Sequence, residues 1–171
     1  MGHPLLREVA RPLEPTEIDS AWLRSLVADM ADTLQDYGGI GLAAPQIAEP
    51  VRVAIIDIAG GPSRYGDLPQ IPKTVFVNPT VEILEGPEAG FWEGCLSVPG
   101  LRGFVERPQH VRVVSLDDRG ERHELELEGF LATVFQHEFD HLDGTLFIDR
   151  MTDSRLLTFE REYGQFHLPE E

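Results

Sequence analysis

A short stretch near the carboxyl end of the chain places two histidines and a glutamate where they can act together. The segment Gln136–His141 reads QHEFDH. Histidines at positions i and i+4 of a helix lie on one face, so both imidazoles can bind a single metal ion. A glutamate beside them can accept the proton of a water molecule. The pattern indicates a metal-dependent hydrolase, with ligands His137 and His141 and with Glu138 as the acid–base catalyst.

A catalytic site for one metal ion usually has three protein ligands and an open position, so a third ligand is expected. In one large class of zinc endopeptidases the pattern continues through a glycine to a third histidine. Gly144 fits that continuation, but Phe147 stands where the histidine should be. Glu160 and Glu162 are ordinary charged residues of a late helix and offer no replacement. The sequence therefore disfavours an endopeptidase.

Cys95, the single cysteine, is the remaining soft ligand. It lies in the segment Glu93–Pro99, which reads EGCLSVP, a composition typical of a loop or strand end with room for an ion. The alternative is a buried, inert thiol. A thiolate and two imidazoles would suit Fe(II), Zn(II), Ni(II) or Co(II). A lone cysteine forms no internal disulfide and fits a reducing compartment.

The elements that position these residues can be predicted from the spacing of apolar side chains. Positions 129–142 are expected to form a helix that packs through apolar residues such as Leu131 and Phe135. A hairpin precedes it, with strands over 111–116 and 123–128 joined by a turn at 117–120.

Earlier and later segments alternate between helix, strand and loop signals. Their expected spans, in chain order, are a helix from Thr16 to Gly38-Gly39, a strand over 51–58, an exposed loop over 60–72, short strands over 74–77 and 81–84 separated by Asn78-Pro79, and a final helix over 153–166. Without repeats or linkers, residues 1–171 are expected to form one α+β domain.

Composition narrows the class of protein. The 171 residues are 42% hydrophobic and 26% charged, which is an ordinary globular balance. The formal net charge of −16 argues against direct nucleic-acid binding, because phosphate contacts need clustered Lys and Arg. There is no apolar run of about 18 residues and no apolar signal core at the start. A cytoplasmic protein without membrane contact is expected.

Three segments, in this order, resemble the signature motifs of peptide deformylases: GIGLAAPQ at Gly39–Gln46, EGCLS at Glu93–Ser97 and QHEFDH at Gln136–His141. The opening HPLLR at His3–Arg7 and the later Asn78-Pro79 also look like the family. The resemblance covers most of the chain and is weakest over 60–73 and after Arg150.

The resemblance implies an enzyme that removes the formyl group from the N-terminal formylmethionine of new proteins and releases formate. It implies a compact fold with antiparallel or mixed β-sheets around a central metal-binding helix. The ligands would be Cys95, His137 and His141, with one divalent ion, commonly Fe(II), and Glu138 would be the acid–base catalyst.

Further roles follow from the resemblance alone. Gln46 and the backbone N–H of Leu96 would bind the formyl oxygen. Gly41 would contact the substrate backbone, and Arg102 matches a position near the outer rim of the site. A methionine pocket is expected on a different ground, because a formyl group is small and most of the binding energy must come from the methionine side chain. The apolar residues Ile40, Phe130 and Val134 are expected either to form that pocket or to be ordinary core.

Two other interpretations remain open. A non-enzymatic module stabilised by metal would keep the three ligands but has no need for Glu138 or Gln46. A relative of the deformylases with a changed substrate would keep all of them. Asp140 is expected to orient a ligand, to pair with Arg102, or to be solvated at the surface.

Some deformylases use a basic C-terminal extension to bind the ribosome. In this chain the segment from Asp149 to Glu171 has fewer basic than acidic residues: Arg150, Arg155 and Arg161 against Asp149, Asp153, Glu160, Glu162, Glu170 and Glu171. Ribosome association through this tail is therefore doubtful.

Overall fold

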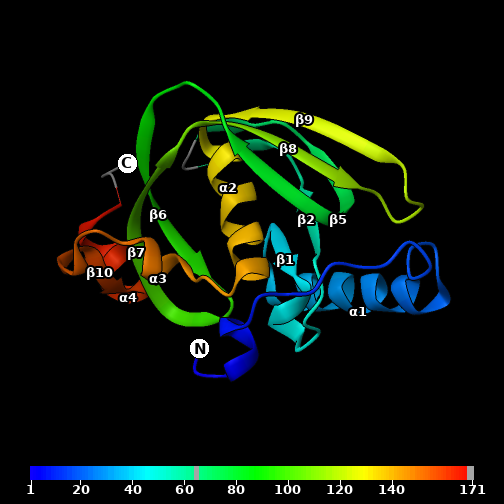
Figure 1. Cartoon of the computed structure of the whole chain (residues 1–171). Coiled ribbons are helices and arrows are strands. Elements are labelled where there is room, and N and C mark those ends of the chain that lie inside the picture. Colours follow the sequence, from blue (N-terminus) through cyan, green and yellow to red (C-terminus); the bar gives the residue numbers. More distant parts are fainter. Residues whose placement is uncertain (64–65, 169–171) are drawn as a thin grey trace.

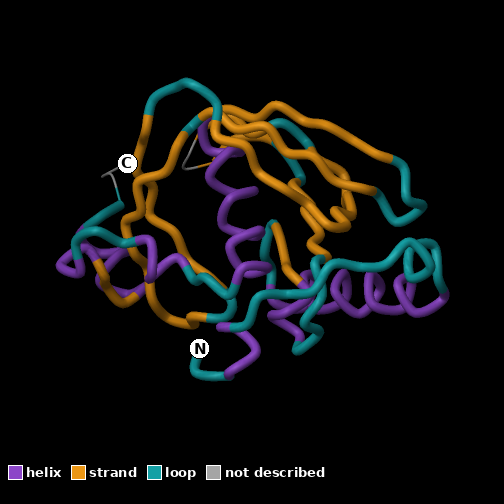
Figure 2. Tube along the Cα trace, in the orientation of Figure 1, coloured by secondary structure: helices purple, strands orange, loops and turns teal. Residues whose placement is uncertain are grey.

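A helix held between two antiparallel β-sheets forms the centre of the molecule (Figures 1 and 2). The computed structural model describes residues 1–63 and 66–168. The larger sheet has the strand order β1-β2-β5-β8-β9, and the smaller has the order β10-β7-β6. Helix α2 (Gly129–Asp140) contacts strands of both sheets. The expected α+β arrangement, with antiparallel sheets around a central helix, is confirmed.

The strands in chain order are β1 (Gly41–Ala43), β2 (Val53–Ile58), β3 (Gly61–Ser63), β4 (Gly66–Leu68), β5 (Ile71–Ile83), β6 (Glu88–Cys95), β7 (Val98–Pro108), β8 (His110–Leu116), β9 (Arg122–Glu128) and β10 (Leu157–Phe159). The other helices are α1 (Ala21–Tyr37), α3 (Phe147–Arg150) and α4 (Glu160–Phe166), with 3-10 turns η1 (Pro4–Arg7), η2 (Ala44–Ile47), η3 (His141–Asp143) and η4 (Ser154–Leu156). Among the residues that the structure describes, no helix has the length and apolar character needed to cross a membrane.

The first long helix begins later than predicted. Instead of starting at Thr16, α1 starts at Ala21, and Ser20 caps it by accepting a hydrogen bond of 3.0 Å from the Leu23 N–H. Asp19 has a φ of 54°, a left-handed conformation that separates the preceding turn from the helix. The predicted end is confirmed, because Gly38 adopts the left-handed C-cap conformation.

The two strands predicted on either side of Asn78-Pro79 are one continuous strand, β5. The pairing of β5 with β8 shifts register between Val77 and Thr80, so the proline lies in a bulge rather than in a break. The Asn78 side chain accepts from the Leu13 N–H at 2.8 Å and donates to the Leu13 carbonyl at 2.9 Å. These bonds fix the bulge to the N-terminal segment.

Two further segments contain more strand than predicted. The expected loop over 60–72 contains β3, β4 and the first residues of β5, while positions 64–65 lie outside the described residues. The expected final helix over 153–166 is divided into η4, β10 and α4. Strand β10 pairs with β7 and sets Thr158 opposite Arg102. This pairing brings the end of the chain beside the smaller sheet.

Apolar packing fixes helix α2 against the larger sheet. Phe135 and Phe139 are buried, and their rings meet Phe76 of β5 at centroid distances of 5.2 and 5.8 Å. A second cluster, which includes the fully buried Leu23 and Met30, joins α1 to β1 and β2. Because the apolar side of α2 is held in this way, its histidine-bearing face is turned toward the smaller sheet.

Candidate metal centre

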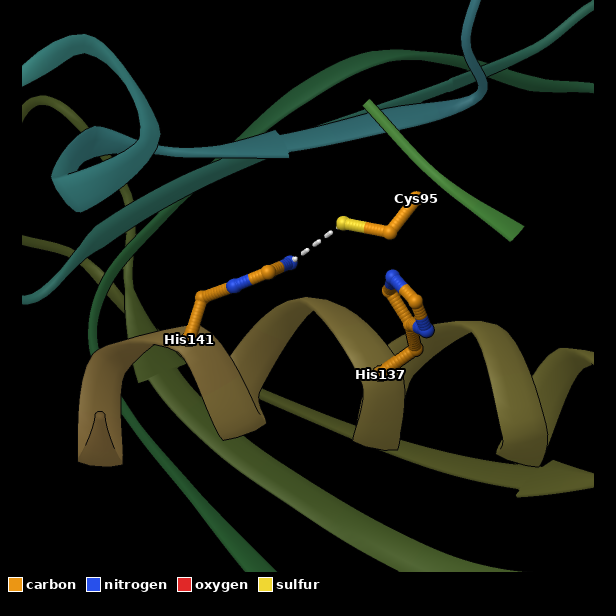
Figure 3. Close-up of side chains that lie close together, drawn as sticks. All are labelled: Cys95, His137 and His141. Carbon is orange, nitrogen blue, oxygen red and sulfur yellow. Dashed lines mark hydrogen bonds between the residues drawn. The ribbon is translucent and has the colours of Figure 1, made fainter. Parts of the chain in front are cut away.

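Three side chains with metal-binding atoms converge between α2 and the end of β6 (Figure 3). His137 lies in the last turn of α2, and His141 begins the 3-10 turn that follows it. Cys95 is the last residue of β6 and pairs with Val98 of β7 at a tight turn. One ligand atom from each of the three residues lies within 4.8 Å of the others. The turn between β6 and β7 therefore places the Cys95 thiol beside the two imidazoles.

The two imidazoles have different electrical surroundings. His137 Nδ1 lies 2.7 Å from a carboxylate oxygen of Glu93, so it carries the proton and leaves Nε2 for the centre. Although burial lowers it, hydrogen bonds to Cys95 and Glu93 raise the pKa of His137 well above its ordinary value. Burial and the neighbouring His137 lower the pKa of His141 well below its ordinary value. The surroundings thus favour positive charge at His137 and the neutral imidazole at His141.

Three nitrogen atoms lie close to the sulfur of Cys95, and two of them donate hydrogen bonds to it. The Ser97 N–H lies 3.4 Å from Sγ, the Gln46 side-chain N–H 3.7 Å and His141 Nε2 3.2 Å. One thiolate and two imidazoles are a donor set that fits a borderline-soft divalent ion.

Glu138 faces the same space from α2. Only 7% of it is exposed, and Oε2 has no hydrogen-bond partner in the part of the chain that the structure describes. Burial raises the pKa of Glu138 to about 7. A carboxyl group with a pKa near neutrality is suited to both accepting and returning a proton. A Cβ on Gly41 would lie 2.6 Å from Glu138 Cγ, so glycine at this position leaves room for the carboxylate.

A buried charge network supports the centre, and the sequence did not predict it. Arg107 binds Glu93 through Nε at 2.6 Å and Asp140 through Nη1 at 2.8 Å. Arg150 completes the set by donating to the other oxygen of Asp140 at 2.6 Å. Although burial raises it, hydrogen bonds from His137 and Arg107 lower the pKa of Glu93. The network connects a metal-site imidazole to two arginines.

The partners of Asp140 differ from those expected, and the burial of Arg107 could have been predicted from its position in the strand. Asp140 pairs with Arg107 and Arg150, so the expected pairing with Arg102 is wrong, as is surface solvation, since Asp140 is buried. Arg107 follows Gly103 and Val105 at a spacing of two along β7, and all three are buried. That register could have placed Arg107 inside the molecule.

A cleft of about 640 Å³ opens from the centre to the surface. It contains the thiol, His137 and Glu138, and it also brings together the residues expected to meet a substrate. Those residues are Ile40, Gly41, Gln46, Leu96, Arg102, Phe130 and Val134. Arg102, at the outer part, donates to Glu160 at 2.7 Å.

A second group of ligand atoms lies within 4.8 Å at the turn between β8 and β9, formed by Asp117, Glu121 and His123. Its members are partly or largely exposed, and Asp117 already accepts hydrogen bonds from the Glu121 N–H and from His123. The less exposed group of Cys95, His137 and His141 is the better fit to a catalytic ion.

Comparison with known proteins agrees with this geometry. The sequence profile of the polypeptide deformylase family matches residues 1–156. The chain belongs to this family. It is a hydrolase that removes N-terminal formyl groups from nascent peptides and depends on a metal ion.

Individual relatives share most of their length with the chain. A peptide deformylase of Leptospira biflexa is 38% identical over 162 residues, covering 95% of this chain and 90% of the relative. Peptide deformylase 2 of Bordetella bronchiseptica is 46% identical over 153 residues, or 90% and 85% of the two chains.

Solved structures show the same fold. A class I type b peptide deformylase from Acinetobacter baumannii, bound to Met-Ala-Ser, superposes with a TM-score of 0.82 at 39% identity, covering 88% of this chain and 94% of its own. Peptide deformylase 1B from Arabidopsis thaliana, in complex with an inhibitor, gives a TM-score of 0.77 at 36% identity, with coverages of 91% and 80%.

Proposed function

We propose that Cys95, His137 and His141 hold the ion of this deformylase, and that Fe(II) is the native metal, with Zn(II), Ni(II) and Co(II) as substitutes. The observation that carries the proposal is that one thiol and two imidazoles meet within 4.8 Å. Beside them lies a carboxyl oxygen of Glu138 that has no hydrogen-bond partner among the described residues. When bound, the ion would lower the pKa of water and polarise the formyl carbonyl.

Glu138 moves the protons of the reaction. It takes a proton from the attacking water and delivers it to the departing peptide amine. Its pKa of about 7 fits both steps, because the group is neither a strong acid nor a strong base at neutral pH. Such a catalyst typically contributes about 10²–10⁴ in rate.

The developing oxyanion is met by the Gln46 amide and by the backbone N–H of Leu96. Gln46 is preset for this role, since its Oε1 accepts from the Ala43 N–H at 2.8 Å and its Nε2 lies 3.2 Å from Ser97 Oγ. These bonds direct the amide N–H group toward Cys95. One preorganised donor of this kind is worth roughly 3 kcal/mol.

The substrate backbone binds along Gly41. Strand β1 lies at an edge of the larger sheet, and an extended peptide can add to such an edge by main-chain hydrogen bonds. The methionine side chain enters the pocket formed by Ile40, Phe130 and Val134, and the following residues extend toward Arg102. A charged first residue should then be turned over much more slowly than methionine.

The whole chain, residues 1–171, acts as one catalytic domain on formylmethionyl nascent peptides in the cytoplasm. A single cysteine suits that reducing compartment. The net charge of −16 argues against direct nucleic-acid binding. The acidic balance of the tail disfavours ribosome binding through it; of its acids, Glu170 and Glu171 lie outside the described residues. Cosedimentation with ribosomes through the tail at low salt would contradict this.

The test is formate release from formyl-Met-Ala-Ser by Fe(II)-loaded protein prepared without oxygen. Met-Ala-Ser, the peptide bound in the Acinetobacter structure, would be the second product. Glu138→Ala should reduce kcat by about 10²–10⁴ while the metal stays bound. Glu88→Ala, at an exposed position of β6, is the matched control and should keep full activity.

If folded, metal-loaded protein released no formate, the motifs would belong to a relative with another substrate. Other N-acylated peptides would then be screened. An unchanged kcat in Glu138→Ala would remove the proposed acid–base role.

A further inference from the structure

The end of the chain lies beyond the family match, which stops at residue 156, and yet it forms part of the cleft. Strand β10 pairs antiparallel with β7, and α4 starts immediately after it. This places Glu160, the first residue of α4, in the wall of the cleft. A wall built from this segment can give the chain a substrate preference of its own.

Glu160 is held there by contact with Arg102. The guanidinium donates to the Glu160 carboxylate at 2.7 Å and lies 5.8 Å from the centre of the Tyr163 ring. Tyr163 is buried and packs against Trp92 of β6 at a centroid distance of 5.3 Å. The helix is therefore anchored to the smaller sheet, and the ion pair is set on a fixed support.

The ion pair lies close to the chemistry. A Cβ on Gly94, the neighbour of Cys95, would lie 2.4 Å from Arg102 Nη1, so the guanidinium rests on the strand that ends at the thiol. Its carboxylate partner is the more open of the two, with 58% of the Glu160 side chain exposed against 21% for Arg102. The Glu160 side chain is therefore more accessible to a substrate than the Arg102 side chain.

We propose that Glu160 is a specificity-determining residue, which makes this deformylase prefer a basic residue at the third position of the formylated peptide. The proposal rests on the proposed function, in which methionine enters the pocket and the peptide extends along β1. In an extended peptide, residues one and three point to the same side, so the third side chain follows methionine toward the cleft wall. There the positive charge of Arg102 is already neutralised, and the Glu160 carboxylate can accept a second cation.

The experiment compares kcat/KM for three peptides, formyl-Met-Ala-Lys, formyl-Met-Ala-Ser and formyl-Met-Ala-Glu, each amidated at its C-terminus. The unsubstituted enzyme should prefer Lys over Glu by about two- to five-fold, the range expected for one partly exposed ion pair. Glu160→Gln should abolish or reverse the preference, because it removes the carboxylate and frees the charge of Arg102.

Glu162→Gln is the matched control. It changes the net charge equally, lies on the same helix, and should leave the preference unchanged, which separates a local contact from attraction by an acidic protein. A wild-type ratio of one, or an equal ratio in wild type and Glu160→Gln, would overturn the proposal. An equal fall of the ratio in both variants would also overturn it.

A second measurement needs no variant. Raising the salt concentration from about 50 to 500 mM should bring the wild-type Lys/Glu ratio toward one, because exposed charges are screened. A wild-type preference that does not respond to salt would contradict a charge-based rim. Failure of the proposed function itself would be seen differently, as no formate release from any of the three peptides.

Discussion

Two charged regions near the cleft are built in opposite ways. Beside the metal centre, the Arg107 and Glu93 side chains are only 4% and 5% exposed, and each has several partners. At the rim, Arg102 and Glu160 form an ion pair that is open to water. A buried charge must be fully partnered to be tolerated, whereas an exposed pair contributes little to stability. Substitution of Arg102 or Glu160 at the rim is therefore expected to leave the buried charges beside the metal centre in place.

Removal of the central arginine should have the largest effect on folding. Arg107→Met would leave the carboxylates of Glu93 and Asp140 buried without their shared partner. The free energy of unfolding, measured by urea denaturation of the metal-loaded protein, should fall by about 3–5 kcal/mol. Arg112→Met, in an exposed network on β8, should cost less than about 1 kcal/mol. Equal losses of unfolding free energy in Arg107→Met and Arg112→Met would contradict the distinction between buried and exposed charges.

Crowding of the catalytic carboxylate should reduce turnover while the fold is retained. In Gly41→Ala the new Cβ would lie 2.6 Å from Glu138 Cγ, so the carboxylate must move. A displacement of about 1 Å at a reacting group can cost on the order of 10²-fold in rate, and kcat for formyl-Met-Ala-Ser should fall accordingly. Gly164→Ala, with open space around the new atom, serves as the control. Full activity of Gly41→Ala would mean that Glu138 tolerates movement.

Loss of the carboxylate behind His137 should weaken metal binding. Glu93→Gln removes the negative partner of Nδ1, and metal affinity should fall about 10–100-fold in competition with a chelator. Glu106→Gln, on an exposed position of β7, should bind metal as the wild type does. If both variants held the metal equally well, the network would serve folding alone.

Breaking the ion pair at the rim should have the smallest effect on the free energy of unfolding. Glu160→Gln breaks an exposed ion pair, and the free energy of unfolding should change by less than about 1 kcal/mol. A loss comparable to that of Arg107→Met would show that α4 depends on the pair and is not simply anchored by Tyr163. Urea denaturation under the same conditions provides the comparison.

The parts of the molecule that sequence predicts well are those fixed by local patterns. Helix α2 and the β8–β9 hairpin follow from apolar spacing, and the histidine pair follows from their place on one helical turn. The position of Cys95 at a strand end was also visible from the glycine before it. These features need no knowledge of distant partners.

The parts that sequence missed depend on distant contacts. Strand β10 exists because three residues pair with β7, some 55 positions earlier in the chain. Arg107 and Glu93 look like ordinary strand charges until their partners from α2 are known. Thr16 offered a plausible cap, but the left-handed Asp19 moved the helix start to Ala21. Nonlocal pairing and buried charge are not encoded in a short window.

The measurement that tests the account most directly is the anomalous X-ray diffraction of crystals of the zinc-loaded protein. We expect one metal peak bonded to Cys95, His137 and His141, at about 2.3 Å from sulfur and about 2.0–2.1 Å from each nitrogen. A main peak at Asp117, Glu121 and His123, or a peak that lacks Cys95 as a ligand, would contradict it.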